Sequence, residues 1–350
     1  MRRRIIVTGG AGFIGSNFLN YWSKLYPDDL LFVVDNLTYA GNLSNIKNLI
    51  EESKINFIKA DIANNKNLEN IFHEHSINHI VNFAAESHVD RSILNPACFI
   101  KTNIEGTFNL LNIFANYWLK NNSPNDWRFL HISTDEVFGS LSINEKKFDE
   151  YSPYKPRSPY SASKAASDHL VMAWFHTYNL PVIVSNCSNN FGPYQFPEKL
   201  IPLTILKLIK GEKVPIYGDG ENIRDWLYVG DHVNALLQVA EKGKVSETYC
   251  IGGHGEMTNK NIVNEICKIM DKIYIDKAPH SKLIYFVEDR PGHDRRYAID
   301  PKKLKNELGW KVEKTFSKNL ELTVRWYLEN IDWCKKVLKN QSLNRRGLNK

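Results

Sequence analysis

The chain has 350 residues, of which 43% are hydrophobic and 24% charged, and its formal net charge is +6. These values are ordinary for a soluble globular protein, and the length allows a large core and two lobes. No basic stripe with interleaved aromatic residues is present, and no apolar run approaches the roughly 20 residues of a membrane span. We therefore expect neither a nucleic-acid nor a membrane partner.

Cysteine usage bears on the compartment. The five cysteines are scattered and form no C-x-x-C pair. This pattern argues against a disulfide framework and against a zinc site, and it favours a reducing compartment. The apolar stretch after the basic N-terminus is too short for a signal peptide. We expect a cytoplasmic protein that holds no metal.

Short apolar runs alternate with longer amphipathic segments in the first half of the chain. The runs predict buried strands at 5–7, 30–34, 56–58, 80–83, 129–132 and 182–184. The intervening segments predict helices at 13–26, 43–52, 68–75, 99–120 and 162–178. Such alternation is typical of an α/β protein with a Rossmann-type, doubly wound parallel sheet, whose ligands bind outside the carboxyl ends of the strands.

The rhythm changes after about residue 186, where Pro and Gly become dense. Helices are expected at 201–210 and 259–271, between loops that line a cleft. We predict a smaller α/β substrate-binding lobe made of 187–225 and 253–335. The larger Rossmann domain would comprise 1–186 and 226–252, and the aperiodic segment 341–350 would be a disordered tail.

The strongest single motif is a Gly-rich turn in IIVTGGAGFIGSNFL, residues 5–19. Gly10, Gly12 and Gly15 satisfy G-x-G-x-x-G, and Gly9 starts an overlapping G-x-x-G-x-x-G. The turn follows a predicted strand and opens a predicted helix, which is the context that this motif requires. Glycines there let the backbone approach a dinucleotide pyrophosphate at the helix N-terminus.

Acidic residues close the second and third predicted strands. Asp35 lies about as far beyond the Gly-rich turn as the acid that accepts hydrogen bonds from the adenosine ribose hydroxyls, which is expected about 20 residues after the turn. No Arg follows it in DNLTYAGN, which favours NAD over NADP. Asp61 closes the third strand and would either lie beside the adenine or cap the next helix.

Tyr160 and Lys164 stand four residues apart on a predicted helix and therefore share one face. A phenol is a poor base at neutral pH, but a nearby ammonium and a positively charged nicotinamide would both lower its pKa. Alone, this pair is more often surface decoration. Behind a dinucleotide motif it becomes a candidate catalytic pair.

The Gly-rich turn, Asp35, Ser133, Thr134 and the Tyr160–Lys164 pair together resemble the extended short-chain dehydrogenase/reductase family. Adjacent acids after Thr134, in STDEVFG, resemble the dTDP-glucose 4,6-dehydratases within it. Further resemblance lies in DNLTYAGN, NFAAESHVDRS, NNFGPYQFPEKLIP, GDGENIRDWLYVGDH and RPGHDRRYAID, so it covers residues 4–330. Phe138 departs from the pattern, which normally has Tyr there.

The resemblance implies an NAD-dependent hydro-lyase that converts dTDP-glucose to dTDP-4-keto-6-deoxyglucose, as in dTDP-rhamnose or related deoxysugar biosynthesis. Tyr160, with Lys164 beside it and assisted by Thr134, would take the C4 hydroxyl proton while the nicotinamide takes the hydride. Glu136 would remove the C5 proton and Asp135 would protonate the departing C6 hydroxyl. The hydride would then return to C6, which regenerates NAD. Opposite pKa shifts are expected for the two acids.

The same resemblance implies the binding residues and the oligomer. The expected NAD contacts are Gly9, Gly12, Phe13, Ile14, Gly15, Asp35, Asn36, Leu37, Thr38, Asp61, Ile62, Ala84, Ala85, Thr102, Tyr160, Lys164 and Asn190. The expected substrate contacts are Ser87, Thr134, Asn189, Lys199, Leu200, Pro215, Ile216, Tyr217, Arg224, Asn259, Arg290, His293 and Tyr297. A homodimer through a four-helix bundle, built from helices 99–120 and 162–178, is also implied.

Two alternatives stay open at this point. One is an enzyme of the same fold that acts on a UDP-sugar as a dehydratase or an epimerase. The other is a catalytically silent NAD-binding module, against which the intact Tyr160, Lys164, Asp135 and Glu136 argue. Turnover of dTDP-glucose distinguishes all three.

Overall fold

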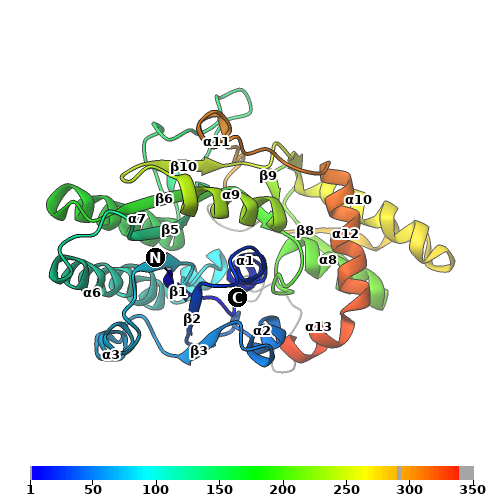
Figure 1. Cartoon of the computed structure of the whole chain (residues 1–350). Coiled ribbons are helices and arrows are strands. Elements are labelled where there is room, and N and C mark those ends of the chain that lie inside the picture. Colours follow the sequence, from blue (N-terminus) through cyan, green and yellow to red (C-terminus); the bar gives the residue numbers. More distant parts are fainter. Residues whose placement is uncertain (1, 290–292, 339–350) are drawn as a thin grey trace.

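A sheet of parallel strands forms the centre of the protein. The computed structural model describes residues 2–289 and 293–338. Its main sheet has seven strands in the order β10-β6-β5-β4-β1-β2-β3 (Figure 1). Their bounds are β1 Arg4–Thr8, β2 Leu30–Asp35, β3 Asn56–Lys59, β4 His79–Asn82, β5 Arg128–Thr134, β6 Val182–Cys187 and β10 Thr248–Ile251. The predicted Rossmann-type fold and the six predicted strands are confirmed; β10 was not predicted.

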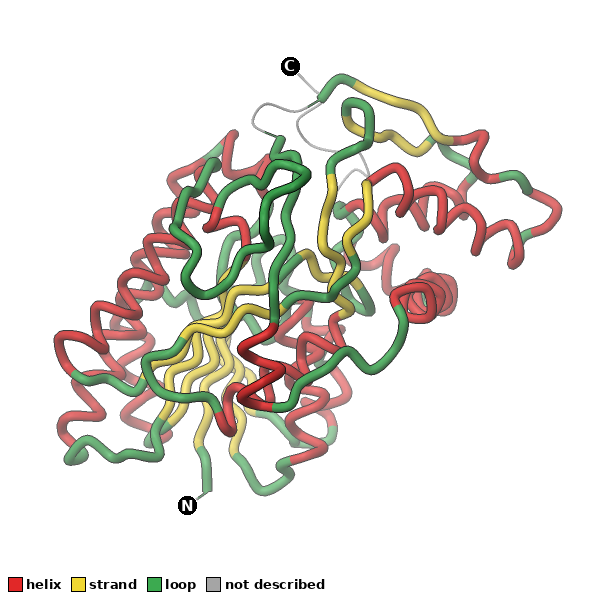
Figure 2. Tube along the Cα trace, turned by 90° about the horizontal axis from the view of Figure 1, so that it is seen from above, coloured by secondary structure: helices red, strands yellow, loops and turns green. Residues whose placement is uncertain are grey.

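Successive strand residues point to opposite faces of this sheet, and helices cover both faces, so the side chains on both sides are buried. Ile5 and Val7 of β1 pack into one apolar cluster and Ile6 into the other. The first cluster includes helices α1, α9 and α11, and the second includes α3, α6 and α7 (Figures 1 and 2). The helices of this part are α1 Phe13–Leu25, α2 Lys47–Glu51, α3 Asn65–His75, α4 Val89–Leu94, α5 Pro96–Phe99, α6 Gly106–Lys120, α7 Pro159–Tyr178, α9 Val229–Lys242 and α11 Lys302–Leu308.

A π-helical segment, Ile100–Glu105, joins α5 to α6. The predicted helix 99–120 is therefore continuous in direction but not in hydrogen-bond pattern, and Thr102 lies in its irregular part. π-Helical segments inside longer helices are frequent at functional sites.

A smaller lobe lies beside the carboxyl end of the main sheet. It contains a three-stranded sheet, β11-β9-β7, and a two-stranded sheet, β12-β8. The bounds are β7 Asn189–Phe191, α8 Leu200–Lys210, β8 Val214–Tyr217, β9 Ile223–Tyr228, β11 Glu256–Thr258, α10 Asn259–Ile273, β12 Ile284–Val287, α12 Phe316–Glu329 and α13 Ile331–Leu338. The division into two chain-discontinuous domains stays a prediction, and α11, inside the predicted lobe segment 253–335, packs in the first cluster of the main sheet. The segment predicted to be a disordered tail, 341–350, and Arg290 lie outside the described residues.

The described part of the chain contains no helix long and apolar enough to cross a membrane. In the same part, no group of His, Cys, Asp or Glu side chains is arranged to hold a metal ion. All five cysteines are free thiols.

The cluster under α6 gives a stability prediction. Leu110 is fully buried there, so we expect Leu110→Ala to lower the free energy of unfolding by about 2–5 kcal/mol through lost burial and a residual cavity. Leu119, on the same helix, is 49% exposed, and Leu119→Ala should change it by less than about 0.5 kcal/mol. Urea unfolding followed by circular dichroism measures both; equal losses would contradict this account of the core.

Candidate active site

A cavity of about 320 Å³ opens at the carboxyl ends of β1, β2, β4, β5 and β6. Strand order reverses between β1 and β4, and this is the position where open α/β sheets bind ligands. The backbones after these two strands approach closely, because a Cβ built on Gly9 would lie 2.7 Å from Ala84 N. The cavity thus begins where the sequence motif predicted a dinucleotide.

The Gly-rich turn fits a pyrophosphate. Gly9 has φ +65°, a conformation that side-chain-bearing residues rarely adopt. A Cβ on Gly15 would lie 2.5 Å from Gly9 O. Helix α1 starts at Phe13, so the amides of its first turn point toward the cavity wall formed by Gly12, Phe13 and Ile14. These features provide the bare backbone and the helix N-terminus that a diphosphate needs.

Asp35 anchors the next part of the wall. Its two carboxylate oxygens accept hydrogen bonds from Ala11 N at 3.0 Å and Leu37 N at 2.8 Å. Burial raises its pKa, and these two amides act in the opposite direction. Asp35, Asn36 and Thr38 line the cavity, whereas Leu37 does not. Leu37 serves through its backbone amide, which holds Asp35.

Asp61 lines the cavity and does not cap the next helix, whose N-cap is Asn64. One oxygen accepts a hydrogen bond from Ala63 N at 2.9 Å and so caps the following turn. The other accepts from Asn36 Nδ2 at 3.3 Å, and Asp61 lines the cavity together with Ile62.

The remaining expected NAD contacts also lie on the cavity wall. They are Ala84, Ala85, Thr102, Tyr160, Lys164 and Asn190. Asn190 Oδ1 lies 2.8 Å from Nδ1 of the buried His232, which fixes the orientation of the amide. His232 was missed by the sequence analysis, because no sequence spacing connects it to Asn190.

The paired acids follow the end of β5 directly. The chain turns there into a short 3₁₀-helix, Asp135–Phe138, and the Thr134 hydroxyl accepts a hydrogen bond from Glu136 N at 3.3 Å. Strand alternation therefore stops, and Thr134, Asp135 and Glu136 all line the cavity. Adjacent side chains can share one site only because of this turn.

Asp135 has the properties of an acid that keeps its proton. It is 1% exposed, and its Oδ2 has no hydrogen-bond partner among the described residues. Burial first, and then the neighbouring charges of Glu136 and Asp225, hold its pKa well above the usual range. This direction suits a proton donor, and the opposite pKa shifts expected for the two acids stay a prediction.

Tyr160 lies in the first turn of α7, which starts at Pro159 behind a Ser158–Ser161 capping box. Burial and then the charge of Glu136 raise its pKa, while a hydrogen bond with Thr134 lowers it. Lys164 Nζ donates to Ile132 O at 2.8 Å and lies 3.3 Å from His131 Nε2. That Lys164 and a bound nicotinamide lower the Tyr160 pKa stays a prediction.

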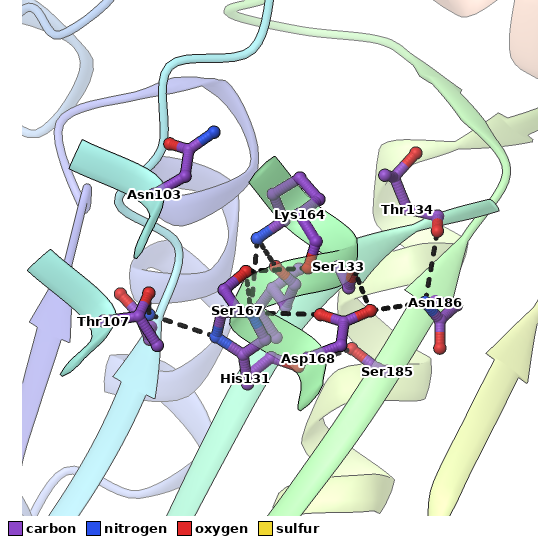
Figure 3. A network of polar contacts seen from close by, with 12 residues as sticks. Asn103, Thr107, His131, Ser133, Thr134, Lys164, Ser167, Asp168, Ser185 and Asn186 are labelled. Carbon is purple, nitrogen blue, oxygen red and sulfur yellow. Dashed lines mark hydrogen bonds and ion pairs between the residues drawn. The ribbon is translucent and has the colours of Figure 1, made fainter. Parts of the chain in front are cut away.

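A buried polar network lies beneath the catalytic candidates (Figure 3). Asp168 Oδ2 accepts hydrogen bonds from Ser133 Oγ at 2.7 Å, Tyr154 OH at 2.9 Å and Asn186 Nδ2 at 3.3 Å. His131 Nε2 lies 3.3 Å from the other Asp168 oxygen. The sequence analysis did not find this network, because its members come from β5, β6, α7 and a loop.

Phe138 does not reach the cavity. Its ring packs 5.2 Å from Phe148 and 5.2 Å from Tyr154 in a small apolar core, and the residue is 2% exposed. The departure from the family pattern thus affects packing behind the acids rather than the cavity wall.

The expected substrate residues divide into two groups. Ser87, Thr134, Asn189 and Lys199 line the cavity, and Lys199 Nζ donates to Ser87 O at 3.4 Å. The others described do not line it: Leu200, Pro215, Ile216, Tyr217, Arg224, Asn259, His293 and Tyr297. Lining residues that the sequence analysis missed include Tyr39, Glu86, Gln195, Phe196 and Glu198.

Part of the second group gathers in the smaller lobe. Arg224 Cζ lies 4.4 Å from the centroid of the Tyr297 ring, and the Tyr217 and His293 rings are 6.2 Å apart. Burial and then the charge of Glu136 raise the pKa of Tyr297, and Arg224 opposes the upward shift of the Asp135 pKa. Both acids are therefore within electrostatic reach of this lobe.

With this geometry in place, comparisons with known proteins identify the family. The model of the GDP-mannose 4,6 dehydratase family matches residues 6–323. The dTDP-glucose 4,6-dehydratase of Salmonella typhimurium is 50% identical over 344 residues, and the match covers 95% of each chain. That of Xanthomonas campestris is 51% identical over 337 residues, again 95% of each. The chain belongs to the dTDP-glucose 4,6-dehydratase family.

Solved structures agree with this assignment. The dTDP-glucose 4,6-dehydratase of Bacillus anthracis in complex with NAD has a TM-score of 0.85 at 44% identity, covering 96% of this chain and 99% of that one. The Streptomyces venezuelae enzyme with NAD and TYD bound has a TM-score of 0.87 at 40% identity, covering 95% and 99%. UDP-glucose 4-epimerase of Thermotoga maritima is 29% identical, with a TM-score of 0.83 and coverage of 94% and 99%.

Asp35 offers a test of the part of the cavity wall that is predicted to bind the dinucleotide. Asp35→Asn keeps the size of the side chain but removes a charged acceptor, so we expect NAD affinity to fall about tenfold or more. Isothermal titration calorimetry measures the change. An unchanged affinity would contradict the role of Asp35 at the ribose.

His232 gives a pH prediction. Burial lowers its pKa to about 3, so its contribution to stability is present above the unfolded pKa of about 6.5 and is lost as the pH falls toward the folded value. Between pH 7 and pH 5 we expect the wild-type chain to lose about 2 kcal/mol of unfolding free energy relative to His232→Asn. Urea titrations at both pH values measure this difference. An equal loss of unfolding free energy in the wild type and in His232→Asn would contradict it.

Proposed function

We propose that this protein is an NAD-dependent hydro-lyase that converts dTDP-glucose to dTDP-4-keto-6-deoxyglucose, in the biosynthesis of dTDP-rhamnose or a related deoxysugar. One observation carries the proposal: Thr134, Asp135, Glu136 and Tyr160 share the wall of the cavity that the Gly-rich turn opens. The likeness at 50% identity to dTDP-glucose 4,6-dehydratases supports the choice of substrate. The likeness to UDP-glucose 4-epimerases is weaker, at 29% identity.

The residues present fit NAD. The bare backbone at Gly9, Gly12 and Gly15 would face the pyrophosphate, and Asp35 would accept from the adenosine ribose. Tyr160 and Lys164 would adjoin the nicotinamide end. Bound NAD would supply the redox chemistry, accepting the hydride from C4 and later returning it to C6.

Three side chains would carry the proton transfers. Tyr160, beside Thr134, would accept the proton of the C4 hydroxyl. The resulting C4 ketone makes the C5 proton acidic, and Glu136 would remove that proton and return it to C5 when the hydride reaches C6. Asp135, whose pKa is held well above its usual range, would donate its proton to the departing C6 hydroxyl.

The nucleotide would extend into the smaller lobe. Ser87 and Thr134 would contact the glucose, and Lys199 and Arg224 suit the diphosphate, because cationic side chains bind phosphate oxygens. The other residues that we propose for the nucleotide are Asn189, Leu200, Pro215, Ile216, Tyr217, Asn259, Arg290, His293 and Tyr297.

A homodimer through α6 and α7 belongs to the same proposal. Apolar side chains on and next to these helices are exposed: Phe108 is 41% exposed, Ile100 51% and Tyr178 47%. Phe108 of α6 also packs edge-on against Trp174 of α7, 5.8 Å between centroids, so the two helices present one apolar face. The cytoplasmic location expected from the scattered cysteines stays a prediction.

A substrate panel tests the reaction directly. Purified protein incubated with dTDP-glucose, UDP-glucose and GDP-mannose should form a 4-keto-6-deoxy sugar from dTDP-glucose, identified by mass spectrometry. Turnover of a UDP-sugar alone would favour the epimerase-like alternative. Binding of dTDP-glucose without any reduction of bound NAD would favour the silent module.

Glu136→Gln separates the two acids. Without the C5 base, exchange of the C5 proton with solvent should fall by at least about a hundredfold, whereas C4 oxidation should survive. Deuterium incorporation from D₂O and the absorbance of reduced cofactor report the two steps. Unimpaired exchange would remove Glu136 from this role.

Asp135→Asn should act later in the reaction. The amide cannot donate a proton to the C6 hydroxyl, so we expect C5 exchange to continue while product formation slows by about a hundredfold or more. The ratio of exchange to product formation measures this effect. Equal losses in both would contradict the assignment of the C6 step to Asp135.

A further inference from the structure

Three segments that are distant in sequence meet beside the cavity. Tyr39 comes from the loop after β2 and lines the cavity wall. Arg91 of α4 places its Cζ 3.5 Å from the centroid of the Tyr39 ring. Its guanidinium also lies 3.2 Å from Glu198 Oε2, in the loop before α8. We call Tyr39, Arg91 and Glu198 the clasp.

Tyr39 makes two further contacts across the same boundary. Its hydroxyl lies beside the Ser87 side chain, in the segment after β4. Its ring packs edge-on against Phe196, 5.7 Å between centroids, in the loop before α8. Tyr39, on the adenosine side of the cavity, thus contacts both the segment after β4 and the loop before α8.

The clasp is shielded from solvent. The side chain of Arg91 is 18% exposed and that of Glu198 is 12% exposed. Cation–π contacts and ion pairs are stronger when they are desolvated in this way, because water competes less for the charges. A planar guanidinium can stack on a ring and bind a carboxylate at the same time, which an ammonium cannot do.

We propose that the clasp retains the dinucleotide through the turnover, and that a bound sugar nucleotide tightens it. This inference rests on the proposed function, in which the hydride is held away from the sugar between C4 oxidation and C6 reduction. Release of the cofactor in that interval would leave the reaction unfinished. The clasp joins the loop that carries Asn36 and Thr38, next to the adenosine, to the loop before α8.

The coupling to the substrate follows from chain connectivity. Lys199 adjoins Glu198 in sequence and donates to Ser87 O at 3.4 Å, while the Ser87 side chain lies beside the Tyr39 hydroxyl. Lys199 and Ser87 are both proposed substrate contacts. A ligand that orders them orders the partners of Tyr39 and Arg91 as well, and by linkage each ligand then strengthens binding of the other.

The rate of NAD dissociation from the full-length chain tests the proposal. Labelled NAD is chased with excess unlabelled NAD, with and without dTDP. We expect Tyr39→Ala and Arg91→Ala to release NAD about tenfold faster than the wild type. Dissociation from the wild type should slow when dTDP is added, whereas dissociation from these two variants should not.

Matched variants separate the clasp from general damage. Tyr39→Phe keeps the ring and loses only the hydroxyl beside Ser87, so its rate should stay within about threefold of the wild type. Arg91→Lys keeps the charge but not the stacked plane and should be intermediate. Tyr151 is 91% exposed, and Tyr151→Ala should match the wild type.

Wild-type rates in Tyr39→Ala and Arg91→Ala would overturn the clasp, and a full dTDP effect in both would overturn its coupling to the substrate. These outcomes are distinct from failure of the proposed function, which would appear as a wild-type protein that does not convert dTDP-glucose. The dissociation rates still judge the clasp in that case.

Discussion

The buried carboxylate of Asp168 is the point on which the catalytic wall depends. It accepts hydrogen bonds from Ser133 at the end of β5, from Asn186 in β6 and from Tyr154 in the loop before α7. Asn186 Nδ2 also donates to Thr134 O at 3.1 Å, so β6 holds the last residue before the acids. An ionisable group at 1% exposure is stable only with such partners, and removing any of them leaves buried polar atoms unsatisfied.

This anchoring explains how neighbouring residues can do different chemistry. β5 must end at Thr134 for the 3₁₀-helix to start, and that turn brings Asp135 and Glu136 to one cavity. Asp135 lies deeper, where burial and the charge of Glu136 favour its neutral form. The difference between the two environments, rather than the residue types, would divide the proposed roles of acid and base.

Local patterns made the fold predictable. Short continuous apolar runs marked six strands of the main sheet, and the Gly-rich turn located the start of α1. β10 has only four residues, Thr248–Ile251, and α12 combines a buried face with many charges, so neither stood out from the loops around it. The site was predictable where residues adjoin in sequence, as in Thr134–Glu136 or Tyr160 and Lys164. The site was not predictable where contacts join residues that are distant in sequence. Lys164 Nζ donates to Ile132 O, and the clasp joins α4 to the loop after β2 and the loop before α8.

The fate of the hydrogen on C4 of the sugar tests the central claim most directly. When dTDP-glucose labelled with deuterium at C4 is converted in ordinary water, the account predicts a 4-keto-6-deoxy product that carries the deuterium at C6, read by mass spectrometry and NMR. A product without deuterium at C6, or a sugar that returns with deuterium at C4 and its C6 hydroxyl intact, would contradict the account.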